Sequence, residues 1–98
     1  MLLFAACVGE VVPKDDVVAK CYEQSRAKKF ECLSDIATER GDEHICMYII
    51  DPGFRTRCVK EVAVQQCDAS RCETIQESWK RPSCTALVEE AKRSGSCR

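Results

Sequence analysis

Residues 46–58 have the sequence CMYIIDPGFRTRC, in which two cysteines lie on either side of an Asp-Pro pair. Asp51 is a typical N-cap residue, and Pro52 suits the first position of the helix that follows. Because Pro52 also keeps the residue before it out of the α region, a preceding helix must end at this pair. The segment therefore predicts a short helical hairpin, with Cys46 and Cys58 at similar distances from its turn.

The same arrangement occurs three times along the chain, with a period of 25 or 26 residues between corresponding cysteines. The cysteine pairs of the three units are Cys21 and Cys32, Cys46 and Cys58, and Cys72 and Cys84. An acidic residue precedes the first cysteine of each unit: Asp16, Asp42 and Asp68. Periods of this length are typical of stacked supersecondary units, none of which can bury its apolar face alone.

These patterns predict an all-α fold, a disulfide-stapled stack of three helical hairpins with about six helices. The helices are expected near 16–25, 27–40, 42–50, 52–65, 68–77 and 80–93. The expected core consists of Val18, Leu33, Ile36, Ile45, Ile49, Val59, Val62, Ile75, Leu87 and Val88.

The near-constant spacing of the cysteines within a unit favours pairing across each hairpin, which would contribute about 2–4 kcal/mol per bridge. The expected disulfides are Cys21–Cys32, Cys46–Cys58, Cys72–Cys84 and Cys67–Cys97, the last clamping the C-terminal segment onto the stack. Pairing between neighbouring units, Cys32–Cys46 and Cys58–Cys72, is the main alternative and is also geometrically feasible. Zinc binding is not expected, because structural zinc sites use closely spaced cysteine pairs and this chain has none.

The chain begins MLLFAAC, in which two small residues precede Cys7. This segment is similar to the lipobox of prokaryotic lipoproteins, a resemblance that implies lipidation of Cys7. We therefore expect residues 1–7 to be a remnant of a signal peptide or lipobox, residues 8–15 a linker, and residues 16–98 a single helical-repeat domain. Nine cysteines in 98 residues indicate a disulfide scaffold, so an extracytoplasmic location, secreted or anchored at the cell surface, is predicted.

The charge balance excludes some partners, because 15 basic and 16 acidic residues give a formal net charge of −1. No electrostatic attraction to nucleic acid is expected, and a membrane would be reached only through a lipid anchor at Cys7. The chain has no phosphate-binding glycine loop, nucleophile elbow or metal motif, so neither a cofactor nor catalysis is predicted. The single histidine, His44, is interpreted as an exposed residue of a helix-capping turn.

The hairpin tips hold the residues that we consider possible contacts to a protein partner: Phe54, Arg55, Trp79 and Arg81. Aromatic and arginine side chains dominate binding hot spots. The sequence thus favours a non-enzymatic module for protein–protein interaction, or one with a structural role at the cell surface. The alternative is an exported redox or hydrolytic enzyme that uses a reactive cysteine, namely Cys46, Cys67 or Cys72.

Residues 16–91 resemble the cysteine-containing helical-hairpin repeats of secreted or surface proteins of uncultivated archaea. The likeness is clearest in the second unit, from its acidic cap at Asp42 to Ala63. It implies no particular activity. A weaker resemblance connects the chain with the coiled-coil-helix-coiled-coil-helix proteins, whose two helices each carry a cysteine pair and are joined by disulfides.

Overall fold

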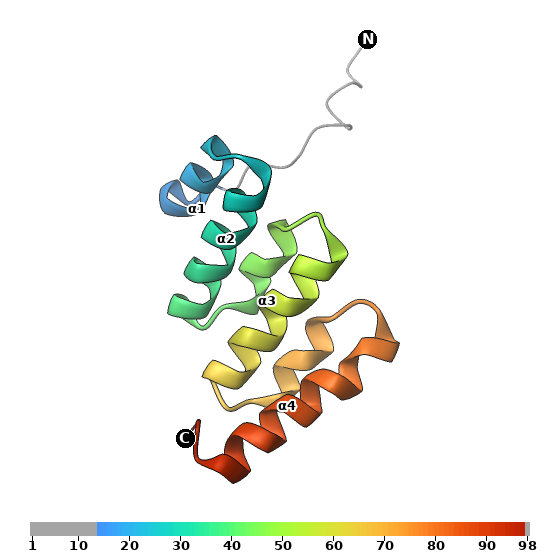
Figure 1. Ribbon diagram of the computed structural model, residues 1–98. Coiled ribbons are helices and arrows are strands. Elements are labelled where there is room, and N and C mark those ends of the chain that lie inside the picture. Colours follow the sequence, from blue (N-terminus) through green and yellow to red (C-terminus); the bar gives the residue numbers. More distant parts are fainter. Residues whose placement is uncertain (1–13, 98) are drawn as a thin grey trace.

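A computed structural model describes residues 14–97 of the chain, and in this part it contains only helices and turns (Figure 1). The elements are α1 (Asp16–Lys20), η2 (Cys21–Glu23), α2 (Arg26–Arg40), η3 (Glu43–Tyr48), α3 (Pro52–Gln65), η4 (Ala69–Thr74), η5 (Ser78–Lys80) and α4 (Arg81–Ser94), where η denotes a 3-10 helix. The predicted all-α, disulfide-stapled fold is confirmed.

The described chain is a stack of three units, each with a short helical segment followed by one long helix. The long helices α2, α3 and α4 lie side by side in one layer (Figure 1). The short helices form a second layer, in which η3 packs against both α2 and α3, and η4 against both α3 and α4. η3 and η4 therefore each join their own unit to the preceding one.

The short segments differ from expectation in their helix type. We expected helices over 42–50 and 68–77, but η3 and η4 are 3-10 helices of six residues. In place of the first expected helix, 16–25, the chain forms the five-residue helix α1, which continues as the 3-10 helix η2 and ends at Glu23. Segments this short gain little from α-helical propagation, and 3-10 geometry is used in such short pieces.

Each unit begins at an aspartate that caps its short helix. The carboxylates of Asp42 and Asp68 accept hydrogen bonds from the backbone N–H groups of His44 and Ser70. In the first unit the cap is Asp15 rather than Asp16, which is already inside α1. These side chains satisfy backbone donors that a helix start leaves unpaired.

The turn at the end of α2 is left-handed, because Gly41 has a φ of 64°. The N–H of Asp42 then bonds to the carbonyl of Ala37 at 2.9 Å, which is the Schellman arrangement. Cys67 occupies the same place after α3 with a φ of 52° and is the only described non-glycine residue at positive φ. The chain reversal between units is thus repeated even where the sequence offers no glycine.

The four described disulfides are the pairs that the repeat favours. They are Cys21–Cys32, Cys46–Cys58, Cys72–Cys84 and Cys67–Cys97, with Cα separations of 5.5–5.8 Å. These separations lie in the usual range for cystines. The alternative of pairing between neighbouring units is wrong, since each of the six cysteines of the repeat is bonded within its own hairpin.

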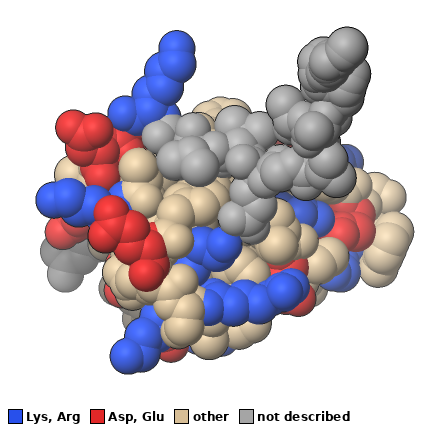
Figure 2. Space-filling view, turned by 90° about the horizontal axis from the view of Figure 1, so that it is seen from above, with Lys and Arg blue, Asp and Glu red and all other residues tan. Residues whose placement is uncertain are grey.

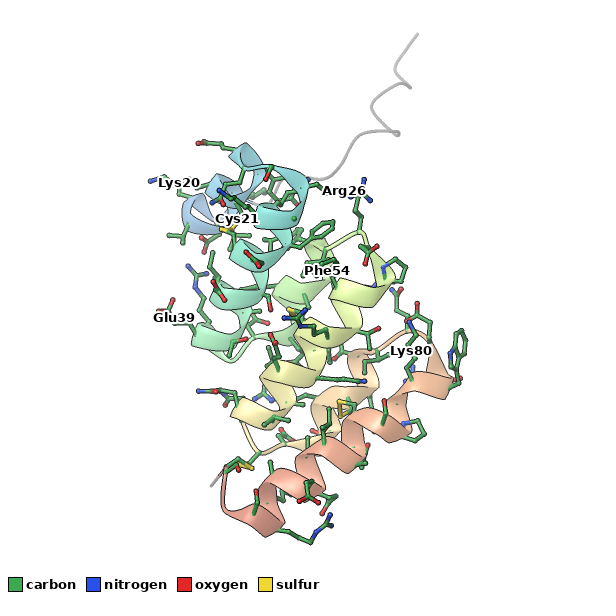
Figure 3. All side chains as sticks on the ribbon, viewed as in Figure 1. Lys20, Cys21, Arg26, Glu39, Phe54 and Lys80 are labelled. Carbon is green, nitrogen blue, oxygen red and sulfur yellow. A yellow bond between two sulfur atoms is a disulfide. The ribbon has the colours of Figure 1, made fainter. Side chains whose placement is uncertain are left out.

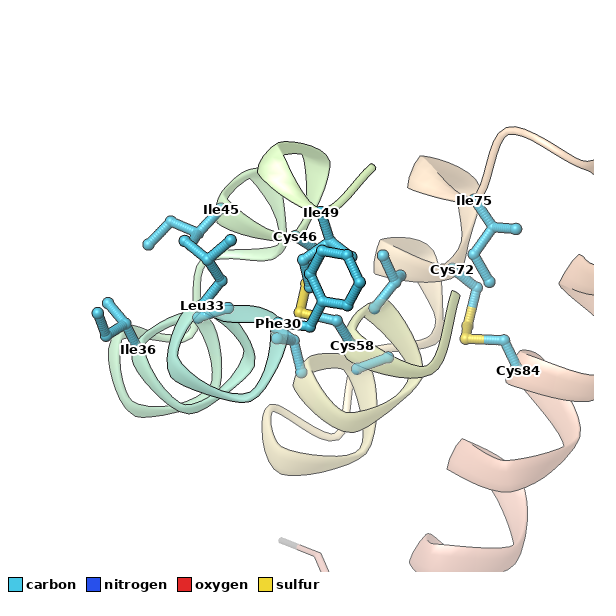
Figure 4. Close-up of a cluster of buried hydrophobic side chains, with 14 of the residues drawn as sticks. Phe30, Leu33, Ile36, Ile45, Cys46, Ile49, Cys58, Cys72, Ile75 and Cys84 are labelled. Atoms are coloured by element: carbon cyan, nitrogen blue, oxygen red, sulfur yellow. A yellow bond between two sulfur atoms is a disulfide. The ribbon is translucent and has the colours of Figure 1, made fainter. Parts of the chain in front are cut away.

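One continuous core runs through the stack. In Figure 4, Leu33 of α2 lies beside Ile45 of η3, and Phe30 lies beside Ile49 at the end of the same short helix. The side chains of the first unit therefore pack against those of the second. Nine of the ten residues expected in the core are buried.

Leu87 is the exception, because this residue is 46% exposed. On α4 the buried residues are Cys84, Val88 and Ala91, which follow helical spacing and fall on one face. Leu87 is next to Val88 in sequence and so points about 100° away from it, off the hairpin interface. The sequence prediction for Leu87 was wrong because Val88 alone fills this position of the core.

Several positions that are buried between units are exposed at the two ends of the described stack. Three positions of the long helices are buried in the first two units and exposed in the third. In the order of the units, they hold Phe30, Thr56 and Pro82, then Leu33, Val59 and Thr85, and then Ala37, Ala63 and Glu89. At the other end, Lys20 and Gln24 are exposed where the second unit buries Ile45 and Ile49. Most of these exposed residues are polar, as is typical of capping repeats in stacked arrays.

Thr56 offers a test of core packing. Its hydroxyl is buried and has no hydrogen-bond partner among the described residues. A Thr56→Val substitution keeps the shape and removes this polar atom, so we expect the free energy of unfolding to rise by about 1 kcal/mol. Denaturant titration of the oxidised protein measures the change. The matched control is Thr38→Val, which deletes a hydroxyl that donates to the carbonyl of Ser34 at 2.9 Å and should not stabilise. Equal effects of both substitutions would contradict this account.

The disulfides give a second prediction. Loss of each bridge costs about 2–5 kcal/mol, against a total stability of about 5–15 kcal/mol for a typical domain. Full reduction should therefore leave the chain largely unfolded or molten under native conditions. Circular dichroism melts with and without reductant measure this, and unchanged cooperative melting after reduction would show that packing alone holds the stack.

Candidate protein-interaction surfaces

The turns of the second and third units, residues 49–54 and 75–80, lie on the same edge of the stack (Figure 1). Three large hydrophobic side chains are exposed there: Ile50, Phe54 and Trp79. We call these three residues the turn edge. Trp79 is the most exposed large hydrophobic residue of the described chain, at 75%.

Both turns are held by an arginine at the same position of the repeat. Arg55 donates to the carbonyl of Ile49 at 3.3 Å, and Arg81 donates to the carbonyl of Ile75 at 2.7 Å. These carbonyls end the short helices and have no intrahelical partner. The two arginines named as possible partner contacts thus brace the turns from inside.

Arg55 also connects the two turns. Its guanidinium forms an ion pair with Glu77 of the third unit at 3.6 Å, and both side chains are largely buried. The other two residues expected to contact a partner are more accessible. Phe54, which is labelled in Figure 3, is 38% exposed. Its ring lies against that of Phe30 of the first unit, with ring centroids 5.2 Å apart. The structure brings the four predicted residues to one edge, with Phe54 and Trp79 open to solvent.

A second surface lies on the layer of long helices. A groove of about 620 Å³ runs along α2, α3 and α4. We call it the α2–α4 groove and define it by Asp35, Glu39, Lys60, Glu61, Val64 and Leu87. This groove was not predicted from the sequence. A signal was present, since Asp35, Glu61 and Leu87 all lie three residues after the second cysteine of their units.

Several charged side chains form hydrogen bonds or ion pairs between segments of the stack. Arg71 of η4 donates to the carbonyl of Gly41 and to the carboxylate of Glu43, each at 2.7 Å, and so links the third unit to the second. Asp15 pairs with Arg40 at 2.8 Å, and this hydrogen bond, helped by the N–H of Val18, lowers the pKa of Asp15 to about 2. Basic and acidic side chains are interspersed in the view of Figure 2.

Residues 14–97 contain no candidate metal site, no cysteine outside a disulfide and no membrane-spanning helix. No group of three or more histidine, cysteine or acidic residues is arranged to hold a metal ion there. All eight cysteines of this part are in disulfides, including Cys46, Cys67 and Cys72, the thiols on which an enzymatic role would depend. No described helix is long and apolar enough to cross a membrane. Cys7, the expected lipidation site, lies outside the described residues.

The fold defines a small, disulfide-rich, all-α domain whose four bridges indicate an oxidising environment. The chain matches no protein-family model, and no curated protein or solved structure is significantly similar to it. The resemblance to helical-hairpin repeat proteins and to coiled-coil-helix-coiled-coil-helix proteins stays a prediction.

The role of Arg55 can be tested by substitution. Arg55→Met keeps an apolar stem but leaves the carbonyl of Ile49 and the carboxylate of Glu77 without this cation. We expect a loss of about 1–3 kcal/mol in the free energy of unfolding, measured by denaturant titration. Arg57→Met is the control, because the Arg57–Glu61 ion pair is exposed and should contribute less than about 1 kcal/mol. Equal losses for the two variants would show that Arg55 does not brace the turns.

Proposed function

We propose that this protein is a non-enzymatic, extracytoplasmic helical module that binds another protein through its turn edge. The observation that carries the proposal is the exposure of Trp79 at the tip of a turn that is otherwise tied to the stack. An exposed tryptophan contributes nothing to the core of its own unit. Tryptophan is enriched among the residues that dominate binding energy.

The rigidity of the turn edge supports this proposal. The turn before α4 is fixed by Arg81 and by the disulfide between Cys72 and Cys84, and the turn before α3 by Arg55 and its own disulfide. Side chains on such a scaffold lose little conformational freedom on binding, so more of the contact energy remains as affinity.

The proposed location outside the cytoplasm rests on the cystines. Disulfides persist in oxidising compartments and are rare where thiols are kept reduced. Secretion and anchoring at the cell surface are alternatives within this proposal, because the anchor would be a lipid on Cys7. A structural role at the surface would use the same stapled stack.

The test is affinity capture with the oxidised protein from the extracytoplasmic fraction of its source, followed by mass spectrometry. We expect one enriched protein whose apparent affinity falls at least tenfold with Trp79→Ser, because hot-spot truncations cost about 2 kcal/mol or more. Val17→Ser is the control, since Val17 is also an exposed hydrophobic residue but lies on α1. Unchanged capture by the Trp79→Ser variant would refute the turn edge as the binding surface.

A further inference from the structure

The α2–α4 groove is built from equivalent positions of the three units. The position three residues after the second cysteine is Asp35 in the first unit, Glu61 in the second and Leu87 in the third. All three residues are exposed, so this position is not part of the core. Its side chain can therefore vary without disturbing the stack, and its identity determines the chemistry of the groove.

The third unit supplies an apolar end to the groove. Leu87 is 46% exposed, and the half-buried Val64 of α3 lines the groove with it. The core position of α4 is already filled by Val88, which is fully buried. Leu87 thus presents aliphatic surface to the groove, where the other two units have carboxylates.

The first unit supplies an acidic wall. Glu31, Asp35 and Glu39 are spaced four residues apart on α2, and all three are exposed. No ion pair or hydrogen bond of their carboxylates is found among the described residues. Like charges at this spacing destabilise a helix by about 0.2–0.5 kcal/mol per pair, so the wall gives α2 no stability of its own.

The central helix α3 adds one unpaired cation. Glu61 accepts a hydrogen bond from the hydroxyl of Ser34 at 2.8 Å and pairs with Arg57 at 3.5 Å, so its charge is compensated. Lys60 also lines the groove and has no ion pair among the described residues. The charged groove residues without an ion pair among the described residues are therefore Asp35 and Glu39 on α2, which are negative, and Lys60 on α3, which is positive.

A neighbouring hollow of about 340 Å³ extends the groove toward Phe30 and Phe54. Asp35, Arg57 and Glu61 line both this hollow and the α2–α4 groove, so the two adjoin along α2 and α3. Two adjoining hollows along the helices suit a segment of polypeptide better than a compact small molecule.

We propose that the α2–α4 groove binds a short segment of a partner protein in which lysine or arginine alternates with aliphatic residues. The basic side chains would face Asp35 and Glu39 on α2, and the aliphatic side chains would pack against Leu87 and Val64. The segment would lie along the depression between the long helices. This inference goes beyond the proposed function, because it uses a different surface from the turn edge.

The experiment uses the oxidised full chain, labelled with ¹⁵N, and two synthetic peptides. One is built from a repeated Lys-Leu-Ala triplet and the other from a repeated Glu-Leu-Ala triplet. We expect the basic peptide to shift the amide signals of α2 and of residues around Leu87 in NMR titrations. The acidic peptide should bind at least tenfold more weakly. Equal binding of both peptides, or shifts confined to η3 and η4, would overturn the proposal.

Substitutions separate the groove from general charge attraction. Asp35→Lys should weaken the basic peptide at least tenfold, Leu87→Ser should weaken it severalfold, and Lys60→Gln should tighten it by removing the opposing cation. The control Glu73→Lys makes the same charge change at an exposed residue of η4 outside the groove. If Glu73→Lys weakens binding as much as Asp35→Lys, the attraction is not specific to the groove and the proposal fails. None of these substitutions touches Trp79, so capture of a partner by the turn edge is tested separately.

Discussion

The cystine inside each hairpin is the constraint on which the rest of the structure depends. It holds the short helix against the long helix of its unit at a Cα separation of 5.5–5.8 Å. Helices of six residues such as η3 and η4 are not stable by themselves. The covalent bond replaces the packing area that longer helices would provide, and it fixes which residues face the next unit.

Once each hairpin is fixed, the contacts between units follow from the repeat. Leu33 and Ile45 lie side by side across the first interface, and Arg71 and Arg55 tie the third unit to the second. Positions that are buried between units hold polar, exposed residues at the two ends of the described stack, such as Lys20 in the first unit and Thr85 in the third. The ends are thus poor surfaces for further stacking, and the turn edge and the long-helix face remain for binding.

The sequence predicted the hairpins because their signals are local. Asp51 before Pro52 marks a helix start, and Gly41 marks a left-handed helix end. The inward role of Arg55 could not be predicted, since its acceptor becomes available only when the turn has formed. The exposure of Leu87 was missed for a similar reason: helical periodicity alone does not show which of two adjacent apolar residues meets the partner helix.

The two candidate surfaces differ in how their charges are used, and this difference bears on function. At the turn edge, Arg55 and Arg81 are bound to backbone carbonyls, so the accessible chemistry is mainly that of Ile50, Phe54 and Trp79. Along α2, the carboxylates of Glu31, Asp35 and Glu39 form no ion pair or hydrogen bond among the described residues. An apolar anchor on one surface and open negative charge on the other would let one rigid module distinguish two partner segments of different composition.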